Sequence, residues 1–267
     1  MTTPPTPHCR EAGAGPAVVC LHSNASVSGQ WRGLMERLSS RFHVLAPDSY
    51  GAGQSPEWPS DRVITLDDEA DLIEPVLQRA GEPLVLVGHS YGAAVALRVA
   101  LRRPARVRAL LLYEPTLFSL IEAEGPAPNE ADGIRDAVAA AAAALDRGDR
   151  SEAARCFIDY WMGPGSWART PPERQPAIAA SVLNVRRWAH ALMGEPTPLE
   201  AFGALTMPVL VMTGARSTTS AHGVARRLIP ALPNATAQVF PSLGHMGPIT
   251  HGELVNEAIE RFLLALP

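Results

Sequence analysis

Short runs of consecutive apolar residues recur along the chain, each bounded by glycine, proline or polar residues. Three of them stand out, at residues 17–21, 84–87 and 208–212. Runs of this length without in-out alternation predict strands that are buried on both faces, as in a parallel sheet covered by helices. Weaker runs predict further strands at residues 42–46, 107–113 and 237–240.

Helical patterns separate these runs. They occupy residues 28–38, 66–79, 92–102, 222–232 and 253–264. Strands that alternate with helices in this way predict the α/β class, with a doubly wound, mostly parallel sheet.

The alternation is interrupted once, between residues 115 and 200. This segment favours helices and is broken by several prolines, so we expect a helical cap (115–200) inserted into an α/β core made of residues 1–114 and 201–267. Three tryptophans fall within the expected cap: Trp161, Trp167 and Trp188. Each either anchors the interior of the cap or lines a substrate pocket, and all three are substrate-binding candidates.

Residues 88–92 read Gly-His-Ser-Tyr-Gly and lie between a predicted strand and a predicted helix. This is the context in which a G-x-S-x-G motif forms a nucleophile elbow. The tight turn imposes a strained backbone on the serine, and the flanking glycines leave room for it. We therefore predict that Ser90 is the catalytic nucleophile.

The sequence resembles the α/β-hydrolase family over nearly its whole length. Besides the elbow at 88–92, the resemblance rests on three segments in the family's order: VVCLHS at 18–23, PDSYGAGQS at 47–55 and GHMGP at 244–248. It implies a triad of serine, acid and histidine in that chain order, with backbone N–H groups that stabilise an oxyanion.

The histidine of this resemblance is His245, on a glycine-flanked loop between the last predicted strand and the last predicted helix. We predict that His245 is the general base. Two other histidines have structural interpretations. His251 falls at the start of the last helix, where capping or solvation is expected, and His89 is expected to pack beneath the elbow.

The loop after residue 21 is expected, by family analogy, to help form the oxyanion hole. It reads His-Ser-Asn-Ala-Ser, with serine where many relatives carry glycine. Either Ser23 or Asn24 would therefore supply an N–H beside that of Tyr91, and each such donor contributes about 2.7–4 kcal/mol. His22 is expected to shape the loop by hydrogen bonding.

The acid of the triad is missing from its common position in the family. Residues 213–220 follow a predicted strand but contain no acid, and no Asp or Glu occurs between Glu200 and Glu253. Only Glu114 directly follows a predicted core strand, at the edge where catalytic groups of open α/β sheets collect. Some haloalkane dehalogenases of the family look similar here, because they take their acid from the strand that follows the elbow helix. We predict Glu114 as the acid; the alternatives are a glutamate that only pairs with an arginine such as Arg216, and a serine–histidine dyad.

Composition excludes several function classes. All 23 basic residues are arginine, so the chain has no lysine for a Schiff base, a pyridoxal-phosphate link or a Walker phosphate loop. The net charge is −4 with no basic cluster, the three cysteines lack metal-ligand spacing, and no apolar run is long enough to span a bilayer. We expect no cofactor, no metal, no nucleic-acid partner and no membrane partner, and we expect a cytoplasmic, bacterial protein of undetermined oligomeric state.

These features favour hydrolysis of a small carboxylic ester or related acyl compound through an acyl-enzyme on Ser90. Carbon–carbon hydrolases and lyases on the same scaffold retain the serine and are one alternative. A non-catalytic receptor that binds a ligand is another, since a fold alone does not establish turnover.

Overall fold

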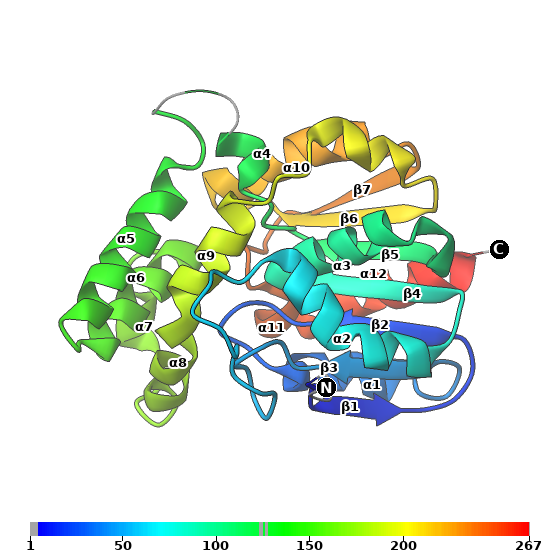
Figure 1. The fold of residues 1–267 in the computed structure, drawn as a ribbon, viewed down its shortest axis with the longest axis horizontal. Coiled ribbons are helices and arrows are strands. Elements are labelled where there is room, and N and C mark those ends of the chain that lie inside the picture. Colours follow the sequence, from blue (N-terminus) through cyan, green and yellow to red (C-terminus); the bar gives the residue numbers. More distant parts are fainter. Residues whose placement is uncertain (1–4, 123–124, 126–127, 267) are drawn as a thin grey trace.

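A seven-stranded sheet forms the centre of the protein (Figure 1). The computed structural model describes residues 5–122, 125 and 128–266. The strand order is β1-β3-β2-β4-β5-β6-β7, in which β1 is antiparallel to β3 and all other neighbours are parallel. The strands are β1 (Cys9–Ala12), β2 (Ala17–Leu21), β3 (His43–Pro47), β4 (Leu84–His89), β5 (Val107–Tyr113), β6 (Val209–Gly214) and β7 (Ala235–Phe240). The predicted α/β class with a mostly parallel sheet is confirmed.

Helices cover both faces of this sheet. Successive strand residues point to opposite faces, so Val18 packs in one hydrophobic cluster and Val19 in the other. One cluster contains residues of α2 (Leu66–Ala80), α3 (Tyr91–Arg102) and α10 (Thr219–Ala231), and the other contains residues of α1 (Arg32–Leu38) and α12 (Gly252–Ala265). Burial on both faces explains why the central strands are continuously apolar in sequence.

The edge strand β1 was not predicted from the sequence. Its residues, CREA, are partly or fully exposed at the edge of the sheet, so they lack the apolar signal of a central strand. The six predicted strands are all present. Two of them, 17–21 and 107–113, have the predicted bounds, and the ends of the other four differ by one or two residues, as at β4, which continues to His89, and at β7, which begins at Ala235.

A run of helices occupies the chain between β5 and β6. They are α4 (Ser119–Glu122), α5 (Asp132–Asp146), α6 (Arg150–Met162), α7 (Ser166–Arg169), α8 (Gln175–Ser181) and α9 (Val185–Met193). In Figure 1, α5–α9 lie beside the carboxyl ends of the parallel strands, where β4 ends. The division of the chain into a core and a cap at residues 115–200 stays a prediction.

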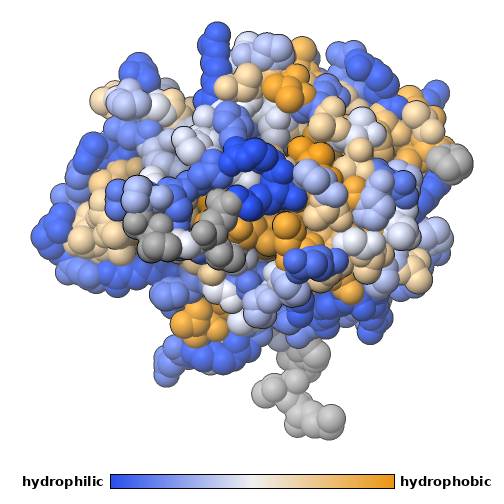
Figure 2. Space-filling model, turned by 90° about the horizontal axis from the view of Figure 1, so that it is seen from above, coloured by the Kyte–Doolittle hydropathy of each residue, from blue (hydrophilic) through white to orange (hydrophobic). Residues whose placement is uncertain are grey.

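The surface mixes polar and apolar residues. On the face shown in Figure 2, hydrophobic and strongly hydrophilic residues lie side by side near the centre, and further hydrophobic residues lie towards the periphery. None of the helices formed by the described residues combines the length and the apolar character needed to cross a bilayer.

Candidate active site

Ser90 occupies the turn between β4 and α3. Its φ of 56° and ψ of −115° are strained for a residue with a side chain, which costs on the order of 1–3 kcal/mol. The neighbouring glycines permit this turn. A Cβ at Gly88 would lie 2.5 Å from the Ala93 Cα, and one at Gly92 would lie 2.3 Å from the Leu21 carbonyl oxygen.

His245 lies on the loop between β7 and α11 (Gly247–Thr250), and only 2% of its surface is exposed. Two side chains hold this loop. His89 Nε2–H donates to the His245 carbonyl oxygen at 2.8 Å, and the Tyr113 hydroxyl donates to the Gly244 carbonyl oxygen at 2.8 Å. His89 thus packs beneath the elbow and also anchors the histidine loop.

Glu114 directly follows β5 and is completely buried. Its φ of 44° is uncommon for a residue other than glycine. Its Oε1 accepts from the Gly214 N–H at 2.7 Å, and its Oε2 accepts from the Ser217 hydroxyl at 2.6 Å and from His245 Nδ1–H at 2.7 Å. Such donors are what a buried carboxylate requires. Within the described residues Arg216 is not among its partners, so the alternative of an ion pair with Arg216 does not apply.

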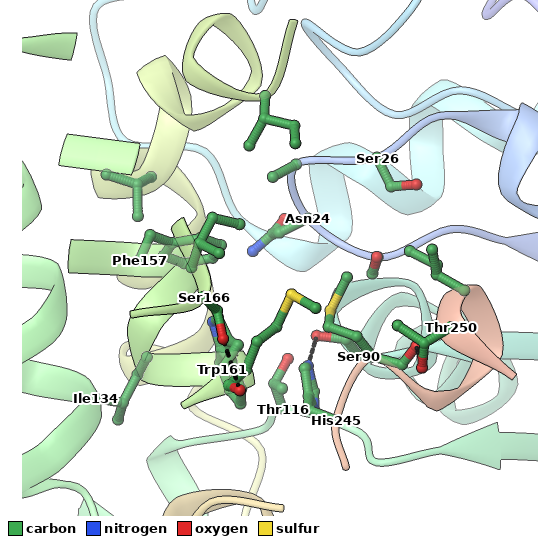
Figure 3. A pocket seen from close by; sticks show the side chains of 18 of the residues that line it. Asn24, Ser26, Ser90, Thr116, Ile134, Phe157, Trp161, Ser166, His245 and Thr250 are labelled. Atoms are coloured by element: carbon green, nitrogen blue, oxygen red, sulfur yellow. Dashed lines mark hydrogen bonds between the residues drawn. The ribbon is translucent and has the colours of Figure 1, made fainter. Parts of the chain in front are cut away.

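A continuous hydrogen-bonded relay joins these three residues. The Ser90 hydroxyl donates to His245 Nε2 at 2.9 Å (Figure 3), and His245 Nδ1–H donates to Glu114 Oε2. Because an ionised carboxylate only accepts, it keeps the imidazole proton on Nδ1 and leaves Nε2 free to accept the serine proton. This is the order of contacts that a hydrolytic triad uses, and the catalytic roles themselves stay a prediction.

The two expected oxyanion donors from the loop after β2 are placed differently. The Ser23 N–H is engaged, since it donates to Gln30 Oε1 at 3.2 Å. The N–H groups of Asn24 and Tyr91 have no acceptor among the described residues. The structure therefore favours Asn24 over Ser23 as the partner of Tyr91, because the serine amide is turned towards Gln30.

His22 holds the peptide that carries the Asn24 N–H. The Ser49 N–H donates to His22 Nε2 at 3.0 Å, so the ring proton is on Nδ1, which donates to the Ser23 carbonyl oxygen at 2.7 Å. In a planar trans peptide the carbonyl and the following N–H point in opposite directions. Fixing the Ser23 carbonyl therefore fixes the direction of the Asn24 N–H.

Gln30 links the oxyanion loop to the histidine loop, and sequence reasoning missed it. Besides accepting from the Ser23 N–H, its Oε1 accepts from the Ser23 hydroxyl at 3.0 Å, and its Nε2 donates to His89 Nδ1 at 3.0 Å. His89 in turn holds the His245 carbonyl. In the sequence Gln30 is one polar residue inside a predicted helix, and nothing in the pattern distinguishes it.

Two buried histidines of this network are held neutral. Burial lowers the pKa of His22 below its ordinary value. Burial, reinforced by the neighbouring His245, lowers the pKa of His89 well below its ordinary value. Neutral rings are required for both, because each has one nitrogen that accepts a hydrogen bond.

A cavity of about 660 Å³ opens over Ser90 and His245. This volume is in the usual range for a site that binds a small molecule. Asn24 and Thr116 line the same cavity (Figure 3), and the Asn24 side-chain oxygen and the Thr116 hydroxyl are buried without a hydrogen-bond partner among the described residues. Thr116 had no sequence signal.

The three candidate tryptophans differ in placement. Trp161 on α6 lines the cavity and stacks on the His245 ring, with centroids 3.8 Å apart and planes at 22°. Trp167 and Trp188 are buried but are not among the described residues that line the cavity. Trp161 thus has the position expected of a pocket residue, and the other two have that of core anchors.

His251 is the cap residue at the start of α12, and its own side chain makes no cap hydrogen bond. Its Nδ1 is 2.9 Å from the Thr250 hydroxyl, at the surface.

In the described part of the chain, no group of three or more His, Cys, Asp or Glu side chains is arranged to hold a metal ion.

Two known proteins named as hydrolytic enzymes are similar to this chain over most of its length. The chain is 28% identical to a pimeloyl-[acyl-carrier protein] methyl ester esterase of Nitrosomonas europaea over 247 residues, which covers 89% of this chain and 92% of that protein. It is 29% identical to a 2-(acetamidomethylene)succinate hydrolase of Mesorhizobium japonicum, covering 97% of this chain and 91% of that protein.

Among solved structures, an alpha/beta hydrolase from Sphaerobacter thermophilus superposes with a TM-score of 0.74. The two sequences are 25% identical, and the match covers 96% of this chain and 98% of the other. The alpha/beta hydrolase fold family matches residues 16–252 of the sequence, which includes the elbow, Glu114 and the histidine loop. The chain therefore belongs to the α/β-hydrolase fold family.

Proposed function

We propose that the protein hydrolyses a small carboxylic ester through an acyl-enzyme on Ser90. The observation that carries this proposal is the relay from Ser90 through His245 to Glu114, which opens into a cavity of small-molecule size. One similar protein is named as a methyl ester esterase, which also supports ester hydrolysis.

In the first half of the reaction the Ser90 oxygen attacks the ester carbonyl while His245 Nε2 takes the hydroxyl proton. Glu114 stabilises the imidazolium that forms, because its carboxylate already accepts the Nδ1 proton. The carbonyl oxygen becomes an oxyanion, to which the N–H groups of Tyr91 and Asn24 donate. When the tetrahedral intermediate collapses, the alcohol leaves with the proton from Nε2.

In the second half a water molecule takes the place of the alcohol. His245 removes a proton from the water as it attacks the acyl-enzyme, and returns that proton to Ser90 when the acid is released. The helices between β5 and β6 act as a cap that shapes the pocket, with Trp161 in contact with both the cavity and His245.

Labelling with a fluorophosphonate probe, followed by a panel of esters, tests the proposal. The Ser90→Ala variant should fold, lose the label and lose at least about a thousandfold in kcat. Ser26→Ala is the matched control, because Ser26 also lines the cavity but lies outside the relay. It should keep the label.

Residual activity of Ser90→Ala above about a tenth of the wild-type value would contradict the nucleophile assignment. Tight binding of esters by the wild type without labelling or turnover would instead support the receptor alternative.

A further inference from the structure

We infer that the cavity selects esters that carry a second, free carboxylate, which Arg169 and Arg174 bind. The ligand class is the half-ester of an aliphatic dicarboxylic acid, or an ester with its carboxylate on the alcohol side. The inference rests on the proposed ester hydrolysis and adds the substrate class.

The charge of the cavity lining is the first observation. The described residues that line it include Arg169 and Arg174 but no aspartate or glutamate. The protein as a whole has a net charge of −4, whereas the arginines of this lining carry only positive charge. Charges of one sign around a cleft concentrate ligands of the opposite sign.

The lack of a carboxylate partner for either arginine is the second observation. Within the described residues neither Arg169 nor Arg174 makes an ion pair with a carboxylate, whereas Arg155 and Arg186 of the same helical run pair with Glu152 and Asp146. Two arginines at one cavity, both without a carboxylate partner, form a binding site for an anion that the protein does not itself supply.

The positions of the two arginines suit a carboxylate. Arg169 is the last residue of α7. Its Nη2 donates to the Ser166 hydroxyl at 3.0 Å, and both Nη atoms donate weakly to the Pro164 carbonyl oxygen at 3.4–3.5 Å, which restrains the side chain. Arg174 immediately precedes α8, and both arginines are exposed to solvent. A planar guanidinium matches a carboxylate with two parallel N–H donors, and these exposed sites let a charged group remain partly hydrated.

Apolar side chains line the same cavity, which sets the character of the rest of the substrate. Phe157, Ile158 and Ile178 are among them. Such walls suit methylene groups rather than further charges. An ester with an aliphatic chain and one remote carboxylate therefore satisfies both kinds of lining.

The experiment compares matched pairs of methyl esters. Monomethyl succinate, glutarate, adipate and pimelate are each compared with the methyl ester of the monocarboxylic acid of equal length, and a carboxymethyl ester of hexanoic acid places the charge on the alcohol side. We expect kcat/KM to be at least about tenfold higher for one charged series than for its neutral partners. The advantage should shrink as NaCl rises, because salt screens exposed charges.

Arg169→Gln and Arg174→Gln should each reduce that advantage about three- to tenfold, because kcat/KM should fall more for the charged esters than for their neutral partners. Arg169→Lys keeps the positive charge and should therefore retain part of the advantage for charged esters. Arg155→Gln is the matched control, since Arg155 lies on α6, pairs with Glu152 and is not among the described lining residues.

Equal kcat/KM for charged and neutral esters in the wild type would overturn the inference and leave ester hydrolysis standing. So would arginine variants that lower charged and neutral esters alike. If no ester is hydrolysed, the proposed function fails, and calorimetric binding of free adipate then tests the arginine site alone. Adipate binding that both variants weaken would support the site, and no binding would refute it.

Discussion

Replacing Glu114 with glutamine tests whether the relay works as a triad or a dyad. The glutamate accepts on both oxygens, from the Gly214 N–H on one side and from Ser217 and His245 on the other. A glutamine of the same size has only one accepting oxygen. Its NH₂ group must face either the Gly214 amide or the histidine.

The structure decides which orientation prevails. If the NH₂ faced the Gly214 N–H, two buried donors would meet, at a cost of about 1–3 kcal/mol. In the opposite orientation the NH₂ donates to the Ser217 oxygen and to His245 Nδ1. The ring proton then moves to Nε2, where it can no longer accept from Ser90. A wrong tautomer of this kind costs roughly 10⁴ in kcat in a serine protease.

We therefore expect Glu114→Gln to lose about 10²–10⁴ in kcat while the protein stays folded. The assay measures kcat on a reactive ester with the active sites counted by titration, and the thermal midpoint by circular dichroism. Ser217→Ala is the control, since it removes a neighbour of the carboxylate but keeps the carboxylate itself, and it should cost under about tenfold. A Glu114→Gln enzyme with nearly wild-type kcat would refute the triad and leave the Ser90–His245 dyad.

Three further predictions follow from the site and its surroundings. His245→Ala should abolish turnover and His251→Ala should not, because only His245 contacts Ser90; the reverse result in the ester assay would show that the wrong histidine was chosen. Trp161→Leu should change relative kcat/KM among esters more than Trp188→Phe does, because Trp161 lines the cavity and Trp188 does not. A uniform loss across all esters would instead indicate that Trp161 is a core anchor. Burial raises the pKa of Glu69 from 4.5 to about 8. Between these pH values the folded protein holds a proton that the unfolded chain releases, so the free energy of unfolding falls as pH rises. Glu69→Gln should therefore lose less thermal stability than the wild type between pH 6 and pH 8, and an equal or larger loss in melting curves would contradict this account.

The sequence alone determined the features that depend on neighbours in the chain. A central strand is apolar along its whole length because helices bury both faces, so six strands could be located from short runs. The elbow is also local, since five consecutive residues between a strand and a helix define its turn. Glu114 could be proposed because the carboxyl ends of parallel strands meet at one edge of the sheet.

Tertiary structure decided everything that depends on direction and distance between remote segments. Ser90 and His245 are 155 positions apart, and only the packed loops bring Oγ to 2.9 Å from Nε2. Whether the Ser23 or the Asn24 amide is free depends on Gln30, which no motif marks. Trp161, Trp167 and Trp188 are equivalent in sequence, yet only the orientation of α6 sets one indole on the histidine. A sequence pattern indicates how a residue is buried. A hydrogen bond or a stacked ring depends on atomic positions to within fractions of an ångström, and only the assembled fold sets those positions.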